Sequence, residues 1–259
     1  MTISDAVPEP STPGATGGRT AVRTGDAAHA GTAAMQGRPR DGRISWQRRA
    51  LDVAVAATSL VLLSPVLLVV ALAVRLSSPG PVIFRQVRLT RGRTPFTLYK
   101  FRTMRVGTAG PEVTRRGDPR VTAPGRLLRK TSLDELPQLV NVLRGQMTLV
   151  GPRPETPALA ARYPAEVAWV LDETPGLTGP AQISLRDDVS VVTVPGAGEA
   201  SVADPEVVER WYVEQLVPLR VATDLTFLRR PTLGATLRVM GWTARYLVTG
   251  QPPVIRPGG

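Results

Sequence analysis

The run Val53–Val74, VAVAATSLVLLSPVLLVVALAV, carries no charged residue and limits the kinds of fold that this chain can adopt. As a helix it is long enough to span the hydrocarbon core of a bilayer, which requires ~20 residues. The default expectation is therefore a membrane-associated helix. The alternative is a long helix buried in a soluble core.

Two features of this run argue against a simple transmembrane span. Ser64-Pro65 lies near its middle, where proline removes a backbone hydrogen bond and bends a helix. Both flanks are basic, whereas a spanning helix usually shows an asymmetry in its flanking positive charge. The sequence therefore predicts a re-entrant helix–break–helix that enters one leaflet and returns to the same side, with Asp52 at the interface beside an arginine. The flanking cations are Arg43, Arg48 and Arg49 before the run, and Arg75, Arg85, Arg88, Arg91 and Arg93 after it.

Composition limits the chemistry of the rest of the chain. The sequence has 259 residues, a formal net charge of +11, no cysteine and a single histidine, His29, in a segment expected to be disordered. These counts exclude a disulfide framework, a cysteine nucleophile, a serine–histidine triad and a multi-histidine metal site. Acid–base chemistry must therefore use carboxylates, with arginine and lysine to hold anions. The basic excess favours a polyanion, a phosphorylated small molecule or an anionic membrane surface as partner.

We divide the chain into four parts. Residues 1–43 are rich in Ala, Gly, Thr, Pro and Ser and contain no Leu or aromatic residue, so they cannot bury enough apolar surface to fold and are expected to form a disordered tail. Residues 44–78 form the re-entrant membrane helix, residues 79–250 a folded domain and residues 251–259 a flexible C-terminus. The expected fold class is α+β, a membrane-associated monotopic domain with short strands and amphipathic interface helices.

The stretch Arg129–Leu139, RKTSLDELPQL, places two adjacent carboxylates behind two cations. Apolar residues recur at helical spacing after it begins, so a helix is expected to start near Ser132. One interpretation is structural: Ser-x-x-Glu is a capping box, and acidic residues suit the positive end of a helix. The other is functional, with Asp134 and Glu135 as a reactive pair.

Two short strands are predicted at residues 82–88 and 95–102, around a polar turn. The second strand contains Lys100, which is one of only two lysines in the chain, the other being Lys130. A position that keeps lysine in so arginine-rich a chain favours a compact ammonium group for phosphate oxygens, and this indication is weaker for Lys130. The alternative is an exposed basic face.

Proline and glycine mark further segments. The prolines of Pro152-Arg153-Pro154 would hold Arg153 in one direction, which suits either a guanidinium that binds a phosphate or a rigid turn in which Arg153 pairs with Glu155. Residues 175–180 are predicted to form a tight turn and residues 181–184 a strand. After residue 205 the pattern predicts helices with one apolar side. Their arginine and aromatic edge suits lipid headgroups or ordinary packing.

Together these blocks resemble, in order, the bacterial sugar transferase family, the monotopic phosphoglycosyl transferases. The resemblance extends from about Arg48 to about Met240, and the ordered series is far more specific than any one motif. It rests on Arg48-Arg49 with Asp52, Ser64-Pro65, GPVIFRQ at 80–86, YKFRTM at 99–104, SLDELPQL at 132–139, NVL at 141–143, VGPRP at 150–154 and PGLTG at 175–179.

The resemblance implies that residues 79–250 are a cytosolic catalytic domain on the inner (cytoplasmic) membrane. The implied reaction transfers a sugar-1-phosphate from a nucleoside diphosphate sugar, usually a UDP-sugar, to polyprenyl (undecaprenyl) phosphate. It releases UMP and starts a surface glycan or exopolysaccharide. The implied partners are that donor, that acceptor and membrane lipid. Nucleic acid is not expected, and a homodimer is compatible with the resemblance.

The motifs also assign roles to residues. Asp134 would be the nucleophile that forms a phosphosugar–enzyme intermediate, and Glu135 would assist with Mg²⁺ or with protons, so both are candidate metal ligands. A carboxylate attacks a diphosphate only if negative charge is neutralised, which a metal and arginines would achieve. The candidate phosphate-binding residues are Lys100, Arg129 and Arg153, and the supporting residues are Asp224 and Gln182.

Departures from the family pattern concern donor selection and leave the reaction class intact. Thr174 stands where many relatives carry a basic residue, residues 183–186 read ISLR where many read VNGR, and residues 187–204 are atypical. Two other functions compete with transfer. The first is a catalytically inactive, membrane-anchored regulator that binds nucleotide sugar without turnover. The second is a basic nucleic-acid binder, which the few aromatic residues and the membrane-length run disfavour.

Overall fold

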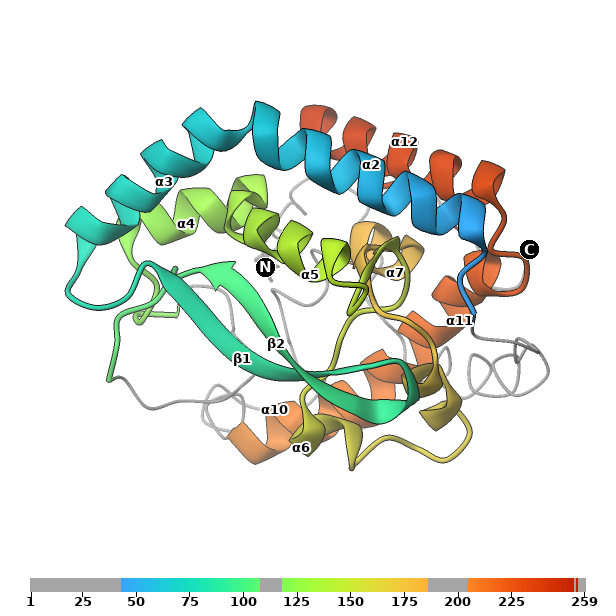
Figure 1. Ribbon diagram of the computed structural model, residues 1–259. Helices are drawn as coiled ribbons and strands as arrows, with labels where there is room; N and C mark the ends of the chain where they lie inside the picture. Colours follow the sequence, from blue (N-terminus) through green and yellow to red (C-terminus); the bar gives the residue numbers. More distant parts are fainter. Residues whose placement is uncertain (1–42, 108–117, 186–204, 254, 256–259) are drawn as a thin grey trace, which may run out of the picture.

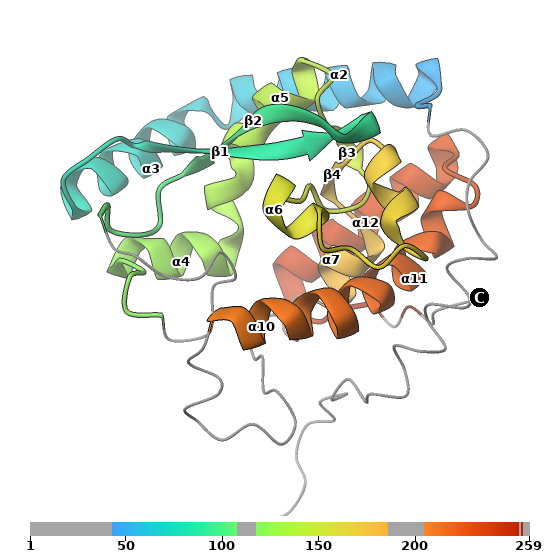
Figure 2. The ribbon, with the colours of Figure 1, turned by 90° about the horizontal axis from the view of Figure 1, so that it is seen from below.

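The computed structural model describes residues 43–107, 118–185, 205–253 and 255. The predicted tail up to residue 42, residues 108–117 and the atypical segment 187–204 lie outside the described residues. Within them, helices predominate and the strands are short, which confirms the α+β class. Figure 1 shows the helices α2 (Trp46–Leu62), α3 (Ser64–Ser77) and α12 (Leu233–Thr249) along one edge, with a β-hairpin farther below them, and Figure 2 gives the view from below.

The uncharged run forms two helices, α2 (Trp46–Leu62) and α3 (Ser64–Ser77), with an angle of 64° between them. The break falls where the sequence predicts it. Pro65 lies in the first turn of α3, where a missing N–H is tolerated, and the Ser64 hydroxyl donates to the Val61 carbonyl at 2.8 Å. Among the described helices none is individually long and apolar enough to cross a membrane, whereas this bent pair is, by length and composition.

Asp52, which the sequence predicts at a membrane interface beside an arginine, is fully buried within the protein, with 0% of its surface exposed. The polar side of α2 packs against strand β3 (Thr148–Val150), where protein groups bond the carboxylate, and its depth relative to a membrane stays a prediction. Arg48 is also buried, at 4% exposure. These residues therefore belong to the folded domain.

The predicted hairpin is confirmed. Strands β1 (Ile83–Thr90) and β2 (Thr94–Phe101) pair antiparallel around the short helix η1 (Arg91–Arg93), and Phe84 lies opposite Lys100. Three apolar side chains of β2 are buried, namely Phe96, Leu98 and Phe101.

The acidic stretch is helical from Leu133, directly after Ser132, as the sequence predicts, but the predicted cap does not form. Helix α4 (Ala123–Thr131) ends directly before Ser132, whose φ of 59° is left-handed. A residue that ends one helix in this conformation cannot take the extended backbone of an N-cap. The Ser132 side chain does not cap the following 3₁₀ helix η2 (Leu133–Gln138), so the capping-box interpretation is wrong. Helix α5 (Leu139–Leu143) continues the segment.

A second, parallel pair consists of β3 and β4 (Gly176–Thr178), so residues 176–178 are a strand where a turn was predicted. The backbones of Gly151 and Gly176 touch so closely that a Cβ on either would overlap the other's main chain. Residues 181–184 belong to a helix, α7 (Pro180–Ser184), where a strand was predicted, because Pro180 occupies a first helical turn.

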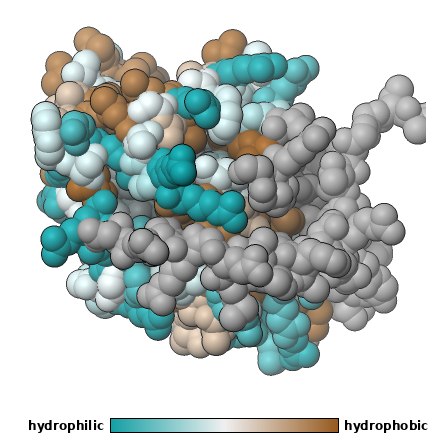
Figure 3. All heavy atoms as spheres, turned by 90° about the vertical axis from the view of Figure 1, so that its right-hand side faces the viewer, coloured by the Kyte–Doolittle hydropathy of each residue, from teal (hydrophilic) through white to brown (hydrophobic). Residues whose placement is uncertain are grey.

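The C-terminal half contributes most of the core. Residues from α11, α12, α5, β2 and β3 form one buried cluster, and Val70, Val74, Phe101 and Leu128 form a second between α3, β2 and α4. In Figure 3 hydrophobic residues gather at the upper left of the face, whereas hydrophilic residues lie at its upper right. The remaining elements are α6 (Pro157–Ala160), η3 (Ala168–Asp172), α10 (Pro205–Trp211), the π-helical turn η4 (Tyr212–Leu216), α11 (Val217–Leu228) and α12 (Leu233–Thr249).

Candidate active site

The acidic pair lies in η2, whose chain packs against β2. Asp134 is 8% exposed, and Glu135 is partly buried. The Lys100 Nζ atom lies 2.9 Å from Glu135 Oε1, so β2 supplies an ammonium group directly to this pair. This contact joins two residues that are 35 positions apart in the chain.

The pKa of Lys100 lies below its usual value in this environment. Burial lowers its pKa, Glu135 is the strongest group that raises it again, and the positive charge of Arg153 lowers it further. Asp134 also raises the pKa of Lys100. Lys100 therefore interacts electrostatically with three of the predicted site residues.

Arg129 approaches the same group from α4. Its Nε atom donates to the Thr103 hydroxyl at 2.9 Å, which fixes the direction of the guanidinium. Burial lowers the pKa of Arg129, and Asp134 provides the largest opposing contribution. Lys130, next to it on α4, is exposed.

Arg153 follows β3 and completes the set. Burial alone would lower its pKa, but neighbouring Tyr212, Glu135 and Glu155 outweigh that effect and raise it. The structure thus brings Asp134, Glu135, Lys100, Arg129 and Arg153 within electrostatic reach of one another. Such a cluster offers two carboxylates as reactive groups or ligands and three cations for phosphate oxygens.

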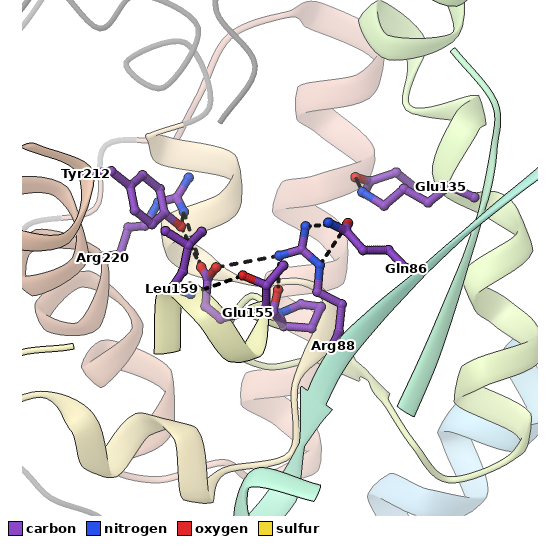
Figure 4. Close-up of polar contacts among 10 residues, drawn as sticks. Gln86, Arg88, Glu135, Glu155, Leu159, Tyr212 and Arg220 are labelled. Carbon is purple, nitrogen blue, oxygen red and sulfur yellow. Dashed lines mark hydrogen bonds and ion pairs between the residues drawn. The ribbon is translucent and has the colours of Figure 1, made fainter. Parts of the chain in front are cut away.

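Arg153 interacts electrostatically with Glu155, as the alternative interpretation expects, but the close contacts of that carboxylate come from other residues. Arg88 lies 3.6 Å and Arg220 4.0 Å from Glu155, and the Tyr212 hydroxyl donates to it at 2.5 Å. Figure 4 shows Glu155 between Arg88 on one side and Tyr212 with Arg220 on the other.

This buried network fastens the segment that carries Arg153. Arg88 also donates to the Pro154 carbonyl at 3.1 Å, so β1 is bonded to the proline-flanked loop. Sequence reasoning placed Arg88 among the membrane-flanking charges and assigned nothing to Tyr212 or Arg220. The only sequence signal for this network was the acidic residue Glu155 next to Pro154. The sequence around Glu155 does not show that Tyr212 and Arg220, far along the chain, are its partners.

Gln182 and Asp224 support the backbone near Arg153. The Gln182 amide donates to the carbonyls of Gly151 and Gly176, both at 3.3 Å. The Asp224 carboxylate accepts the Ala181 N–H at 2.9 Å and so holds α7 against α11. Their bonds therefore act on the β3–β4 pair and on the loop that follows it.

Asp224 makes stability depend on pH. Burial raises its pKa to about 7 from 3.8, outweighing the Ala181 N–H and Arg220, which lower it. The folded protein therefore keeps a proton that the unfolded chain releases, so the free energy of unfolding falls as pH rises from about 4 to about 7. A difference of about 3 between the two pKa values corresponds to about 4 kcal/mol. Urea unfolding at pH 5 and pH 8 should show a smaller loss in Asp224→Asn than in the natural sequence, and equal losses would contradict this origin.

The acidic pair fits the coordination habits of Mg²⁺ only in part. No group of three or more His, Cys, Asp or Glu side chains that could hold a metal occurs in the described ranges. However, Mg²⁺ is commonly bound by one or two carboxylates together with substrate phosphates. Asp134 and Glu135 fit a site of that kind, in which the substrate supplies the remaining ligands.

Comparison with known proteins shows what the chain is similar to. A sequence profile described as "Bacterial sugar transferase" matches residues 43–249. A UDP-glucose:undecaprenyl-phosphate glucose-1-phosphate transferase of Caulobacter vibrioides is 44% identical over 213 residues, which cover 80% of this chain and 71% of the relative.

Two further relatives align over a shorter region. A transferase of Escherichia coli with the same name as the Caulobacter protein is 49% identical over 56% of this chain and 32% of the relative. A UDP-N-acetylgalactosamine-undecaprenyl-phosphate N-acetylgalactosaminephosphotransferase of Aeromonas hydrophila is 39% identical over 52% of this chain and 33% of the relative. The aligned part of the chain thus spans about a third of these two proteins.

Proposed function

Because this chain belongs to the bacterial sugar transferase family, we propose that it transfers a sugar-1-phosphate from a UDP-sugar to undecaprenyl phosphate. The observation that carries the proposal is the convergence of Lys100, Arg129 and Arg153 on the pair Asp134 and Glu135. Three cations around two carboxylates suit a donor that carries a diphosphate. The relatives' names agree with this donor and acceptor class.

The proposed reaction has two displacements. The Asp134 carboxylate attacks the phosphorus next to the sugar, an oxygen–phosphorus bond forms, and the bond to the nucleoside monophosphate breaks, which releases UMP. A phosphate oxygen of the acceptor then attacks the same phosphorus and displaces the carboxylate, giving polyprenyl diphosphate sugar. Lys100, Arg129 and Arg153 neutralise the phosphoryl oxygens, without which a carboxylate and a diphosphate repel each other.

We propose Mg²⁺ as the cofactor, held by Asp134 and Glu135 together with donor phosphates. When bound, it supplies positive charge to the diphosphate. Lys100 keeps Glu135 oriented through their 2.9 Å contact.

The chain is proposed to lie on the cytoplasmic face of the inner membrane, with α2 and α3 inserted as a re-entrant pair. The supporting observation is that the bent pair leaves many large apolar side chains at the surface. They include Val61, Leu62, Leu68, Val69, Leu72 and Leu76, each at least 57% exposed.

A topology experiment tests the re-entrant arrangement. The chain contains no cysteine, so single cysteines can be introduced without a background. Gln47→Cys and Ser77→Cys place thiols at exposed positions in the first turn of α2 and the last turn of α3. In oriented vesicles both should react with an impermeant maleimide from the cytoplasmic side only. Reaction of the two thiols from opposite sides would establish a spanning pair.

The function itself is tested by UMP release. Purified protein would receive a panel of UDP-sugars, Mg²⁺ and undecaprenyl phosphate, and we expect UMP from one donor or a small set of donors. UDP-sugar binding without UMP release from any donor would instead support an inactive regulator.

A further inference from the structure

The first two turns of α2 bond to the segments on which the candidate active site is built. Asp52 accepts the Leu149 N–H at 3.0 Å and the Thr148 hydroxyl at 2.8 Å. Arg48 donates to the Val150 carbonyl at 2.8 Å, and its guanidinium lies 4.9 Å from the centre of the Phe227 ring. One helix thus holds all three residues of β3.

Arg49 makes equivalent hydrogen bonds to α5. Its two terminal nitrogens donate to the carbonyls of Val142 and Leu143, at 2.6 Å and 2.8 Å. These carbonyls lie at the C-terminal end of α5, where carbonyls lack partners within the helix, although the Val142 carbonyl also accepts the Gly145 N–H at 3.0 Å. A cation there also interacts favourably with the helix dipole.

Both segments that α2 holds by hydrogen bonds, β3 and α5, adjoin site residues in the chain. The loop with Arg153 begins one residue after β3, and α5 directly follows η2, which carries Asp134 and Glu135. Strands β3 and β4 have three residues each, and so short a two-stranded sheet is not stable by itself. Its position must therefore come from surrounding contacts.

The cost of burying these polar groups indicates a positional role. A carboxylate at 0% exposure loses its hydration, and its hydrogen bonds recover only part of that free energy. Apolar side chains would join α2 to β3 at lower cost, but they would not fix the register of backbone groups. Hydrogen bonds from Asp52 and Arg48 to successive β3 residues do fix it.

We propose that Arg48, Arg49 and Asp52 are positioning residues, which make α2 the support that holds the Arg153 loop and the Asp134–Glu135 segment in register. This inference rests on the proposed function, because the purpose of the register is transfer chemistry. It also joins the bent helix pair mechanically to the site. Movement of α2 relative to the domain would displace β3 and α5 together.

Hydrogen–deuterium exchange tests the geometry without reference to activity. In the full-length protein, Asp52→Ala should speed exchange across residues 148–153, and Asp52→Asn should retain most protection because its oxygen can accept the Leu149 N–H. Arg75→Ala is the matched control, since it removes an exposed cation from α3. If Asp52→Ala does not fold, Thr148→Val removes one of the two contacts at nearly the same volume. Unchanged exchange in both variants would overturn the proposal.

Turnover tests the consequence. Displacement by about 1 Å can cost 10²-fold in rate, so Asp52→Ala should lower kcat roughly 10- to 100-fold, while Asp52→Asn recovers most of it. In an Arg153→Ala background, Asp52→Ala should lower kcat by no more than about twofold, because the side chain that Asp52 helps to position is already absent. If the losses in kcat of the two single variants multiply in the double variant, Asp52→Ala acts through a general effect on stability. That result would overturn the positioning role. If the natural sequence itself releases no UMP, the proposed function fails, and the exchange result still decides the geometry.

Discussion

Asp134→Asn is expected to lower UMP release by roughly 10⁴-fold or more, because the amide cannot form the covalent bond to phosphorus. Asparagine has nearly the same size and no charge, so the 3₁₀ segment that holds residue 134 should keep its packing. The measurement is UMP release in the presence and absence of undecaprenyl phosphate. Mass spectrometry of the protein after donor addition provides a second reading, since only the natural sequence should gain a sugar phosphate.

The matched control is Asp172→Asn, which changes an acid at 46% side-chain exposure that lies 3.4 Å from Arg93. Such exposed ion pairs contribute little to stability, so its turnover should equal that of the natural sequence. Substantial turnover by Asp134→Asn, or a sugar phosphate adduct on that variant, would refute the nucleophile assignment. It would leave the identity of the family unaffected.

Lys100→Met is expected to lower kcat/KM for the UDP-sugar roughly 10²- to 10³-fold, the usual cost of removing one group that stabilises charge in the transition state. Methionine keeps most of the apolar length of lysine, so packing along β2 changes little. The loss has two physical parts. A cation is removed from the donor phosphates, and Glu135 loses its partner at 2.9 Å.

The chain supplies the control for this variant, since its only other lysine is the exposed Lys130. Lys130→Met makes the same chemical change at the surface of α4 and should leave kcat/KM within about twofold of the natural value. Equal losses in both variants would indicate a general dependence on net charge. No loss in Lys100→Met would remove Lys100 from the site.

Features with a local cause were predictable from the sequence. Ser64-Pro65 breaks the apolar run because proline lacks a donor, and the hairpin follows from two apolar–polar segments around a polar turn. The candidate site residues were identified because the motifs occur in the order typical of the family that the chain resembles. The structure brings three of them, Lys100, Asp134 and Arg153, together. Their roles in transfer remain predictions.

Features with a tertiary cause were not predictable. Arg48 and Asp52 look like charges at the end of a membrane helix, and only β3, nearly 100 residues later, buries them. Ser132 fits the residue pattern of a capping box, but its position at the end of α4 determines its left-handed backbone conformation. Glu155 gains its partners from β1, η4 and α11, which no local pattern connects.

The close approach of Gly151 and Gly176 has a consequence for how such a sequence can diverge. Neither glycine has room for even a methyl group, and each is excluded by the other's main chain. A larger residue at one position cannot be accommodated by a smaller one at the other, since glycine is already the smallest. The two positions therefore form a pair without compensating exchanges.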